Sequence, residues 1–184
     1  MNKIVKFKVK KGKKTFTGPR WGFFKRNDKK FSAKVCFRQN CIYRLTENYD
    51  QINKLIGQSF KILPWYDSLN KKFKPGHHKD SVRFGWRCID GETIELLAYV
   101  RMDGVRMHKP ILTVNPETWA HIEFWESKEK YIFIAMSEDG DGSIVEFDKT
   151  TTKKGILGLF IHRLYPYFGG KIAAPHGMRI DIKI

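Results

Sequence analysis

The side chains best suited to recognition chemistry lie close together in residues 74–87. A glycine turn there carries His77 and His78, and the segment then alternates basic and apolar residues. On a strand, this alternation places Arg83 and Arg87 on one face. Arginine suits bidentate binding of phosphate or carboxylate, so the segment predicts an anion or sugar site with imidazoles at its rim. The predicted ligand-binding residues are His77, His78, Arg83, Trp86 and Arg87.

The same pattern has a structural alternative. A row of strand arginines can pair with acids on the next strand, such as Glu92 or Glu95. His77 and His78 form a weak metal pair, because adjacent strand residues point to opposite faces and no HExxH helix is present. We therefore expect no metal and no cofactor.

No motif in the sequence specifies a reaction. Glu146 and Asp148 place two acids on one strand face, a fragment of what a glycoside hydrolase would need, but such pairs on hairpins are usually solvated. A Walker loop, GxGxxG and GxSxG are all absent. The favoured expectation is a non-enzymatic protein, with catalysis left open.

A second group of chemically active residues is the basic N-terminal segment, residues 1–40. The 184-residue chain has a formal net charge of +16, and this segment holds 14 of its 35 basic and one of its 19 acidic residues. Blocks of like charge often meet acidic partners, nucleic acid above all, although they can also be merely solvated. The predicted polyanion-binding residues are Lys6, Lys8, Lys10, Lys13, Lys14, Arg20, Lys25 and Arg26.

The start of the chain also predicts structure. Residues 4–10 alternate apolar and basic side chains, which indicates a strand with one lysine-lined face. Exposed lysines also protect an edge strand from aggregation. The three cysteines, Cys36, Cys41 and Cys88, favour reduced core thiols. No secretion signal is present, so we expect a cytoplasmic or virion-associated protein.

The elements that must position these residues are mostly strands. Short period-two segments are separated by turns, with Asp-Gly pairs at residues 90–91 and 103–104. Pro110 places the segment 105–114 at an edge or a bulge. Residues 50–60 predict a helix of about two turns, capped by Asp50. No apolar stretch is long enough for a membrane span.

Together these elements predict one domain over residues 1–184. Its fold class is all-β: a two-sheet antiparallel sandwich of the jelly-roll or concanavalin-like type, with one short helix. The segment from Tyr165 to His176, with its aromatics, prolines and Gly169-Gly170, is expected to cover one end of the core.

Two stretches carry a resemblance to known proteins. They are residues 77–106, containing HHKDSVRFGWR, and residues 164–184, containing LYPYFGG and APH. Together they resemble small, functionally unassigned β-sandwich proteins of Bacteroidetes-type bacteria and their phages. The closing segment is also similar to concanavalin-like laminarinase and lectin sandwiches. The ExDxxE catalytic motif of the glucanases is absent.

Three functions fit these observations. The favoured one is a non-enzymatic binding module for an anionic ligand, nucleic acid or another polyanion, in a phage or virion setting. The second is a carbohydrate-binding or carbohydrate-active sandwich, with a concave face lined by Trp86, Tyr99 or Trp125 and with acids nearby. The third is a structural protein that packs on an acidic partner.

Overall fold

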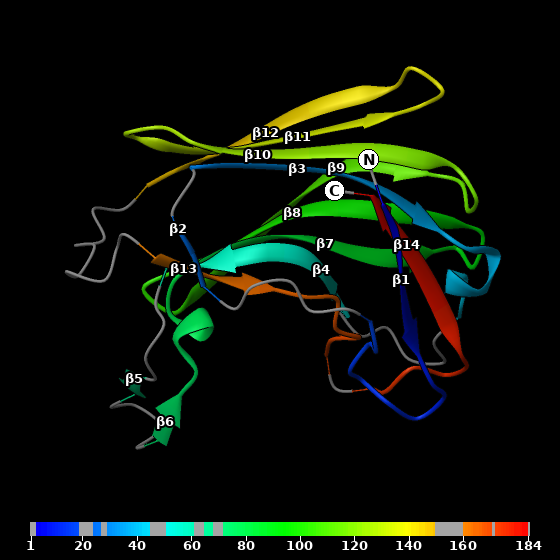
Figure 1. Cartoon of the computed structure of the whole chain (residues 1–184), viewed down its shortest axis with the longest axis horizontal. Coiled ribbons are helices and arrows are strands. Elements are labelled where there is room, and N and C mark those ends of the chain that lie inside the picture. The colour runs from blue at the N-terminus through cyan, green and yellow to red at the C-terminus, as the bar shows by residue number, and fades with distance from the viewer. Residues whose placement is uncertain are drawn as a thin grey trace.

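The protein is described by a computed structural model. It describes residues 3–18, 24–26, 29–44, 51–60, 65–67, 72–149, 160–170 and 172–183. Within them, two six-stranded antiparallel sheets are stacked face to face (Figure 1). This confirms the predicted all-β two-sheet sandwich.

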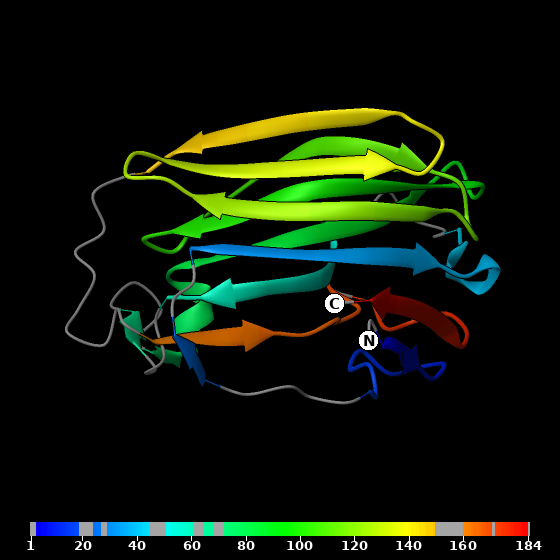
Figure 2. The same cartoon turned by 45° about the horizontal axis from the view of Figure 1, so that its top comes forward.

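Each sheet combines strands from distant parts of the chain, as Figure 2 shows. Sheet A contains, in spatial order, β1 (Ile4–Val9), β14 (Met178–Lys183), β3 (Lys30–Phe37), β10 (Trp119–Glu126), β11 (Lys130–Ser137) and β12 (Gly142–Asp148). Sheet B contains β2 (Phe24–Arg26), β13 (Phe160–Leu164), β4 (Asn53–Ser59), β7 (Ser81–Ile89), β8 (Thr93–Met102) and β9 (Val105–Val114).

The remaining elements are small. A two-stranded ribbon joins β5 (Trp65–Asp67) to β6 (Lys72–Lys74) and projects from one corner of the sandwich (Figure 1). The 3₁₀ turns are η1 (Gln39–Cys41) and η2 (Gly76–His78). In the described part of the chain, no helix is long and apolar enough to cross a membrane.

The core forms where the apolar sides of the alternating strands face each other. On β1, Val5, Phe7 and Val9 are buried while Lys6 and Lys8 are exposed, as the sequence pattern predicts. β1 lies at an edge of sheet A and pairs with β14, so the two ends of the chain are neighbours (Figure 2).

Trp86 lies at the centre of an aromatic group in this core. It is fully buried, and the rings of Phe37, Tyr43 and Phe168 surround it at centroid distances of 5.1, 6.0 and 6.3 Å. Phe168 comes from the 165–176 segment, which therefore covers part of the core as expected.

The hairpin turns follow the sequence closely. Asp103 and Gly104 both have positive φ, +49° and +85°, and join β8 to β9 as a two-residue turn. The strand containing Pro110 is an edge strand with a register shift opposite Leu96 and Leu97, so both features expected for it are present.

The predicted helix over residues 50–60 is wrong. Its residues form β4 instead, and a bulge between Lys54 and Gly57 interrupts the pairing of β4 with β7. The bulge lets the consecutive residues Leu55 and Ile56 both reach the core. Two adjacent apolar residues with Ile52 three positions earlier imitate the spacing of a helix.

The three cysteines are free, as predicted, and Cys36 and Cys41 are buried. Burial raises the pKa of the Cys36 thiol to about 11 and that of Cys41 to about 12. Both thiols are therefore protonated and unreactive at neutral pH.

Candidate functional site

A cleft of about 650 Å³ opens on the outer face of sheet B, the face turned away from sheet A. Its floor contains side chains of β7 and β8, including Arg83, Tyr99 and Arg101. Three segments wall it: η2, residues 165–167, and Thr15 with Phe16 from the N-terminal segment. The cleft therefore joins parts of the chain that are far apart in sequence.

Hydrogen bonds from Ser81 and from the β8–β9 turn fix the η2 wall. Ser81 Oγ donates to the His77 carbonyl oxygen at 2.7 Å, and Gly104 N donates to the Lys79 carbonyl oxygen at 2.9 Å. Asp103 N donates to Asp80 Oδ1 at 3.0 Å. The β8–β9 turn thus holds η2 over the floor of the cleft.

The opposite wall is tied to the bulge in β4. Tyr167 N donates to the Lys54 carbonyl oxygen at 2.9 Å, and Lys54 N donates to the Tyr167 carbonyl oxygen at 2.8 Å. Thr15 forms a further bridge to Tyr167. The basic N-terminal segment and the closing segment therefore meet at this end of the cleft.

Arg83 is the most unusual residue of the floor. Only 8% of the residue is exposed, and its Nε has no hydrogen-bond partner in the described part of the chain. Burial lowers the pKa of Arg83 to about 10; the charge of Arg101 lowers it further, and Tyr99 acts in the other direction. No carboxylate of the described residues pairs with this guanidinium. A buried arginine without a counter-ion is costly unless an anion joins it.

The rest of the cleft has the same sign of charge. Arg101, which is partly buried, donates Nε to the Tyr99 hydroxyl at 3.3 Å, and Nη1 to the carbonyl oxygens of His78 and Gly104 at 3.3 and 3.2 Å. All three acceptors are neutral. Lys54, Arg106 and Arg163 also line the cleft, and none of the described lining residues is Asp or Glu.

Three histidines, His77, His78 and His162, also line the cleft, and burial lowers the pKa of two of them. Burial lowers the pKa of His77 to about 4, and the cations Arg83 and Arg101, with His78 and His162, add to the effect. Burial, followed by Arg83, lowers the pKa of His162 as well. His77 is therefore neutral at pH 7 and can gain a proton when negative charge arrives.

Aromatic side chains complete the cleft. Lys54 Nζ lies 5.3 Å from the ring centroid of Tyr99 and donates to the Ile52 carbonyl oxygen. Phe16, Tyr165 and Tyr167 line the end near the N-terminal segment, and Tyr167 is 39% exposed. Of these rings, Tyr167 offers an exposed apolar face beside the cationic groups, whereas Tyr99 and Phe16 are buried.

The structure separates the residues predicted for the ligand site. His77, His78 and Arg83 meet in the cleft. Arg87 instead pairs with Glu95 across β7 and β8, with Nε 2.6 Å from the carboxylate, as the structural alternative proposed. Trp86 faces the opposite side of the sheet, in the core.

Sequence reasoning did not place Arg101, Arg106, Lys54 or His162 in the site. A signal existed for the first two: the two-residue turn at 103–104 pairs Arg101 with Arg106. Lys54 and His162 had no local signal, because only the long-range pairing of β4 with β13 and β7 brings them to the cleft.

The predicted polyanion-binding residues are spread over two faces. Lys6 and Lys8 lie on the outer face of sheet A, whereas Lys14 Nζ donates to the Gly170 carbonyl oxygen at the edge of the cleft. Lys10 and Lys13 are exposed. Lys25 and Arg26 belong to β2, the edge strand of sheet B, and Arg20 lies outside the described residues.

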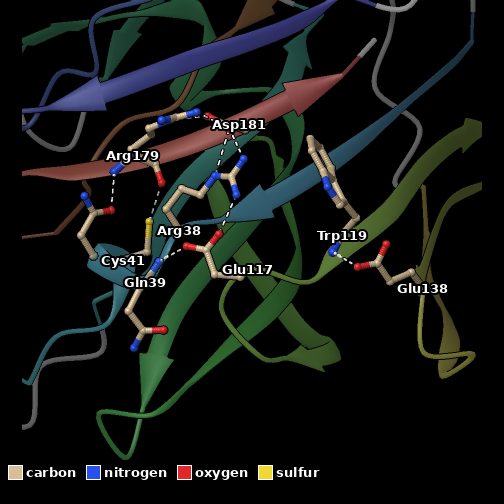
Figure 3. Close-up of polar contacts among 9 residues, drawn as sticks. Arg38, Gln39, Cys41, Glu117, Trp119, Glu138, Arg179 and Asp181 are labelled. Carbon is tan, nitrogen blue, oxygen red and sulfur yellow. Dashed lines mark hydrogen bonds and ion pairs between the residues drawn. The ribbon is translucent and has the colours of Figure 1, made fainter.

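A second charged group, on sheet A, contrasts with the cleft because its charges are balanced (Figure 3). The buried carboxylate of Asp181 accepts hydrogen bonds from Arg38 and Arg179 at 2.5–3.0 Å, and Arg38 also pairs with Glu117 at 2.6 Å. Burial alone would raise the pKa of Asp181, but the two guanidinium groups lower it. We assign this group a structural role.

The other candidate residues are also placed away from the cleft. Glu146 pairs with Lys130 on sheet A, and Trp125 is exposed on the same face. Tyr99 is the one aromatic named for a carbohydrate face that lines the cleft, and the expected acids are absent from the described lining residues. No three His, Cys, Asp or Glu side chains gather to hold a metal ion within the described ranges.

Comparison with known proteins gives a fold without a family. No known family and no curated protein matches the sequence. A marine PL-14 alginate lyase from Aplysia kurodai is similar in structure, with a TM-score of 0.55 and 12% identity over 98% of this chain and 80% of that one. A xylan β-1,4-xylosidase from Bacillus halodurans C-125 has a TM-score of 0.45 and 9% identity, over 96% of this chain and 32% of that one. Scytalido-glutamic peptidase has a TM-score of 0.40 and 5% identity, over 99% of this chain and 64% of that one.

These findings define the class of the protein by its fold. It is an antiparallel β-sandwich of the concanavalin-like type with an acid-free cationic cleft on one sheet, as far as the described residues extend. At 12% identity the likeness to the alginate lyase concerns the fold alone.

Proposed function

We propose that this protein binds an anionic polymer in the cleft of sheet B, and that the polymer is an acidic polysaccharide. The observation that carries the proposal is Arg83, a buried guanidinium whose Nε has no partner, and which has no carboxylate beside it, among the described residues. A carboxylate of the ligand would supply the missing counter-ion through a charge-assisted hydrogen bond.

The shape of the cleft favours a saccharide chain over a nucleic-acid duplex. A duplex carries its phosphates on a wide outer surface, so it would meet the rim rather than a guanidinium at the floor. A single extended chain can reach Arg83, and the exposed ring of Tyr167 offers an apolar face to a sugar. A solved structure of the same fold is an enzyme named for alginate, a polymer of uronic acids, so polyuronates are the first ligands to test.

The test compares two arginines of one strand face. Binding of alginate, polygalacturonate, and single- and double-stranded DNA is measured across a salt series for the wild type, Arg83→Gln and Arg87→Gln. Arg87→Gln is the matched control, because Arg87 lies on the same face but pairs with Glu95 outside the cleft.

We expect Arg83→Gln to weaken polyuronate binding about tenfold or more, since a hydrogen bond to a charged group contributes about 1.5–3 kcal/mol. Arg87→Gln should bind like the wild type. If both variants lose the same affinity, or if the protein binds DNA equally well with and without Arg83, the cleft is rejected as the site. The exposed lysines then remain as the binding surface.

A second candidate function is β-elimination on the same polymer. It is favoured by the neutral His77 beside the Arg83 cation. His77 would act as the base and remove the proton on the carbon next to the carboxylate. A carbon–carbon double bond then forms as the glycosidic carbon–oxygen bond breaks. The leaving oxygen then takes a proton from solvent, while Arg83 stabilises the charge that develops on the carboxylate.

This second function has a direct readout. The unsaturated uronate product absorbs in the ultraviolet, so incubation with alginate or polygalacturonate should raise the absorbance, and His77→Ala should abolish the rise without abolishing binding. Binding without any new absorbance would restrict the protein to a non-enzymatic role.

A further inference from the structure

The floor of the cleft is a grid of residues that face one another across the strands. Strand register defines two neighbouring rows that run from β13 to β9. The first row contains His162, Ser59, Ser81, Arg101 and Arg106. The second row contains Leu164, Gly57, Arg83, Tyr99 and His108.

The positive charges of this grid occupy two places. Arg83 lies in the second row on β7, and Arg101 lies in the first row, directly opposite Arg106. Arg101 is two residues beyond Tyr99, the partner of Arg83, so Arg83 and Arg101 are diagonal neighbours. The Cβ atoms of diagonal neighbours are about 7–8 Å apart, whereas those of directly opposite residues are about 5 Å apart.

The two places differ in depth. Arg83 is buried, and its Nε lacks a partner within the ranges that the structure describes. Arg101 is held by one hydroxyl and two carbonyl oxygens, and Arg106 beside it is exposed. One place can thus enclose a single carboxylate, and the other can meet a second carboxylate near the rim.

We infer that the cleft holds one ligand at two anionic groups, the first on Arg83 and the second on the Arg101–Arg106 pair. The inference rests on the proposed function and specifies its ligand: an acidic oligosaccharide with at least two charged residues, lying across the strands rather than along them. Tyr99 is the cross-strand partner of Arg83, and its hydroxyl accepts a hydrogen bond from Arg101, so this buried residue fixes the spacing between the two charges.

The experiment varies the length of the ligand. Titration calorimetry measures the affinity of galacturonate and of its oligomers from two to four residues, with the corresponding oligomers from alginate in parallel. The proteins are the wild type, Arg83→Gln, Arg106→Gln and the double variant Arg101→Gln/Arg106→Gln. Arg106→Gln changes one exposed side chain and leaves Arg101 in place, so it tests the second place even if the double variant fails to fold.

We expect a gain of about tenfold or more at the first oligomer that reaches both places, corresponding to about 1.4 kcal/mol. Arg106→Gln should reduce this gain, and the double variant should remove it. Arg83→Gln should weaken monomer and oligomers alike.

Two other results distinguish a failure of two-point binding from a failure of the proposed function. If uronates bind through Arg83 with no gain from length, or if the gain survives in both rim variants, two-point binding is wrong and the proposed function stands. If no uronate of any length binds to the wild type, the proposed function fails, and the inference fails with it.

Discussion

His77 is the residue whose charge should respond most to a bound anion. Burial lowers its pKa to about 4, and Arg83, His78, His162 and Arg101 all disfavour a further positive charge. A bound carboxylate offsets these cations and raises the pKa of His77. We therefore expect polyuronate binding to strengthen as the pH falls from 7.5 to 5, because the complex takes up a proton that the free protein does not hold.

The pH series has its own control. His77→Asn should flatten the dependence of Kd on pH, while uronate carboxylates remain ionised over this range. Stability should move in the opposite direction without ligand: unfolded His77 takes up a proton below about pH 6.5, so its neutral burial costs stability as the pH falls toward 4. An affinity that is constant from pH 7.5 to 5 would exclude His77 from the site.

The side chain of Asp181 stabilises sheet A. Its buried carboxylate satisfies two guanidinium groups, so Asp181→Asn should lower the free energy of unfolding by about 3 kcal/mol. Because the pKa of Asp181 is lowered, its contribution is present above the unfolded pKa, about 3.9, and is lost as the pH falls through the folded value. Denaturant unfolding measures both effects.

Glu117→Gln provides the comparison, because Glu117 pairs with the same Arg38 from a half-exposed position. It should cost less than about 1 kcal/mol. Similar losses in the two variants would show that burial of Asp181 adds nothing to this group.

The individual residues of the site were only partly predictable. The residue types and their spacing in the sequence identified His77, His78 and Arg83, because these residues share one short segment. The same spacing treated Arg83 and Arg87 as equivalent, yet one lies in the cleft and the other pairs with Glu95. That difference depends on which neighbouring elements cover the sheet, and period-two alternation contains no such information.

At the scale of the elements, the bulge in β4 positions Arg83. Gly57 approaches β7 so closely that an added Cβ would lie 2.2 Å from the Val82 carbonyl oxygen and 2.3 Å from Arg83 Cβ. We expect Gly57→Ala to destabilise the fold by about 2 kcal/mol or more, and to weaken uronate binding through a displaced Arg83. Thermal unfolding and titration of the surviving folded protein measure the two effects.

Gly177→Ala is the matched control, since a Cβ there would meet only the Val9 carbonyl oxygen at an ordinary 3.7 Å. It should stay within about 0.5 kcal/mol of the wild type. If Gly57→Ala is equally mild, the two backbones can separate without loss, and the bulge does not constrain the cleft.

The elements also show where sequence patterns stop being informative. Asp-Gly turns and strict alternation predicted β1 and the β7–β8–β9 hairpins, because these are local properties. The bulge made β4 resemble a helix, since it turns adjacent apolar residues to one side. The pairing of β4 with β13, which builds part of the cleft, joins residues more than 100 positions apart.

At the scale of the whole molecule, the net charge of +16 acts differently from the cleft. Lys6 and Lys8 lie on the outer face of sheet A, whereas the cleft opens on the outer face of sheet B. The two outer faces are separated by more than the roughly 10 Å between stacked sheets, which exceeds the Debye length of about 8 Å at physiological salt, so the attraction is screened there. The lysines should therefore speed the approach of a polyanion at low salt and contribute little to holding it.

This division of roles predicts the behaviour of Lys6→Gln/Lys8→Gln/Lys10→Gln. Its association rate with a polyuronate should fall several-fold at low ionic strength and match the wild type at physiological salt, with the dissociation rate unchanged throughout. Substitution is preferable to deletion, because removing β1 would also remove the buried residues Val5, Phe7 and Val9. Surface plasmon resonance over a salt series, with Arg83→Gln alongside, measures both rates. If the lysine variant loses binding at physiological salt while Arg83→Gln retains it, the anion-binding surface is the face of sheet A, and the partner is a broad acidic surface rather than a single saccharide chain.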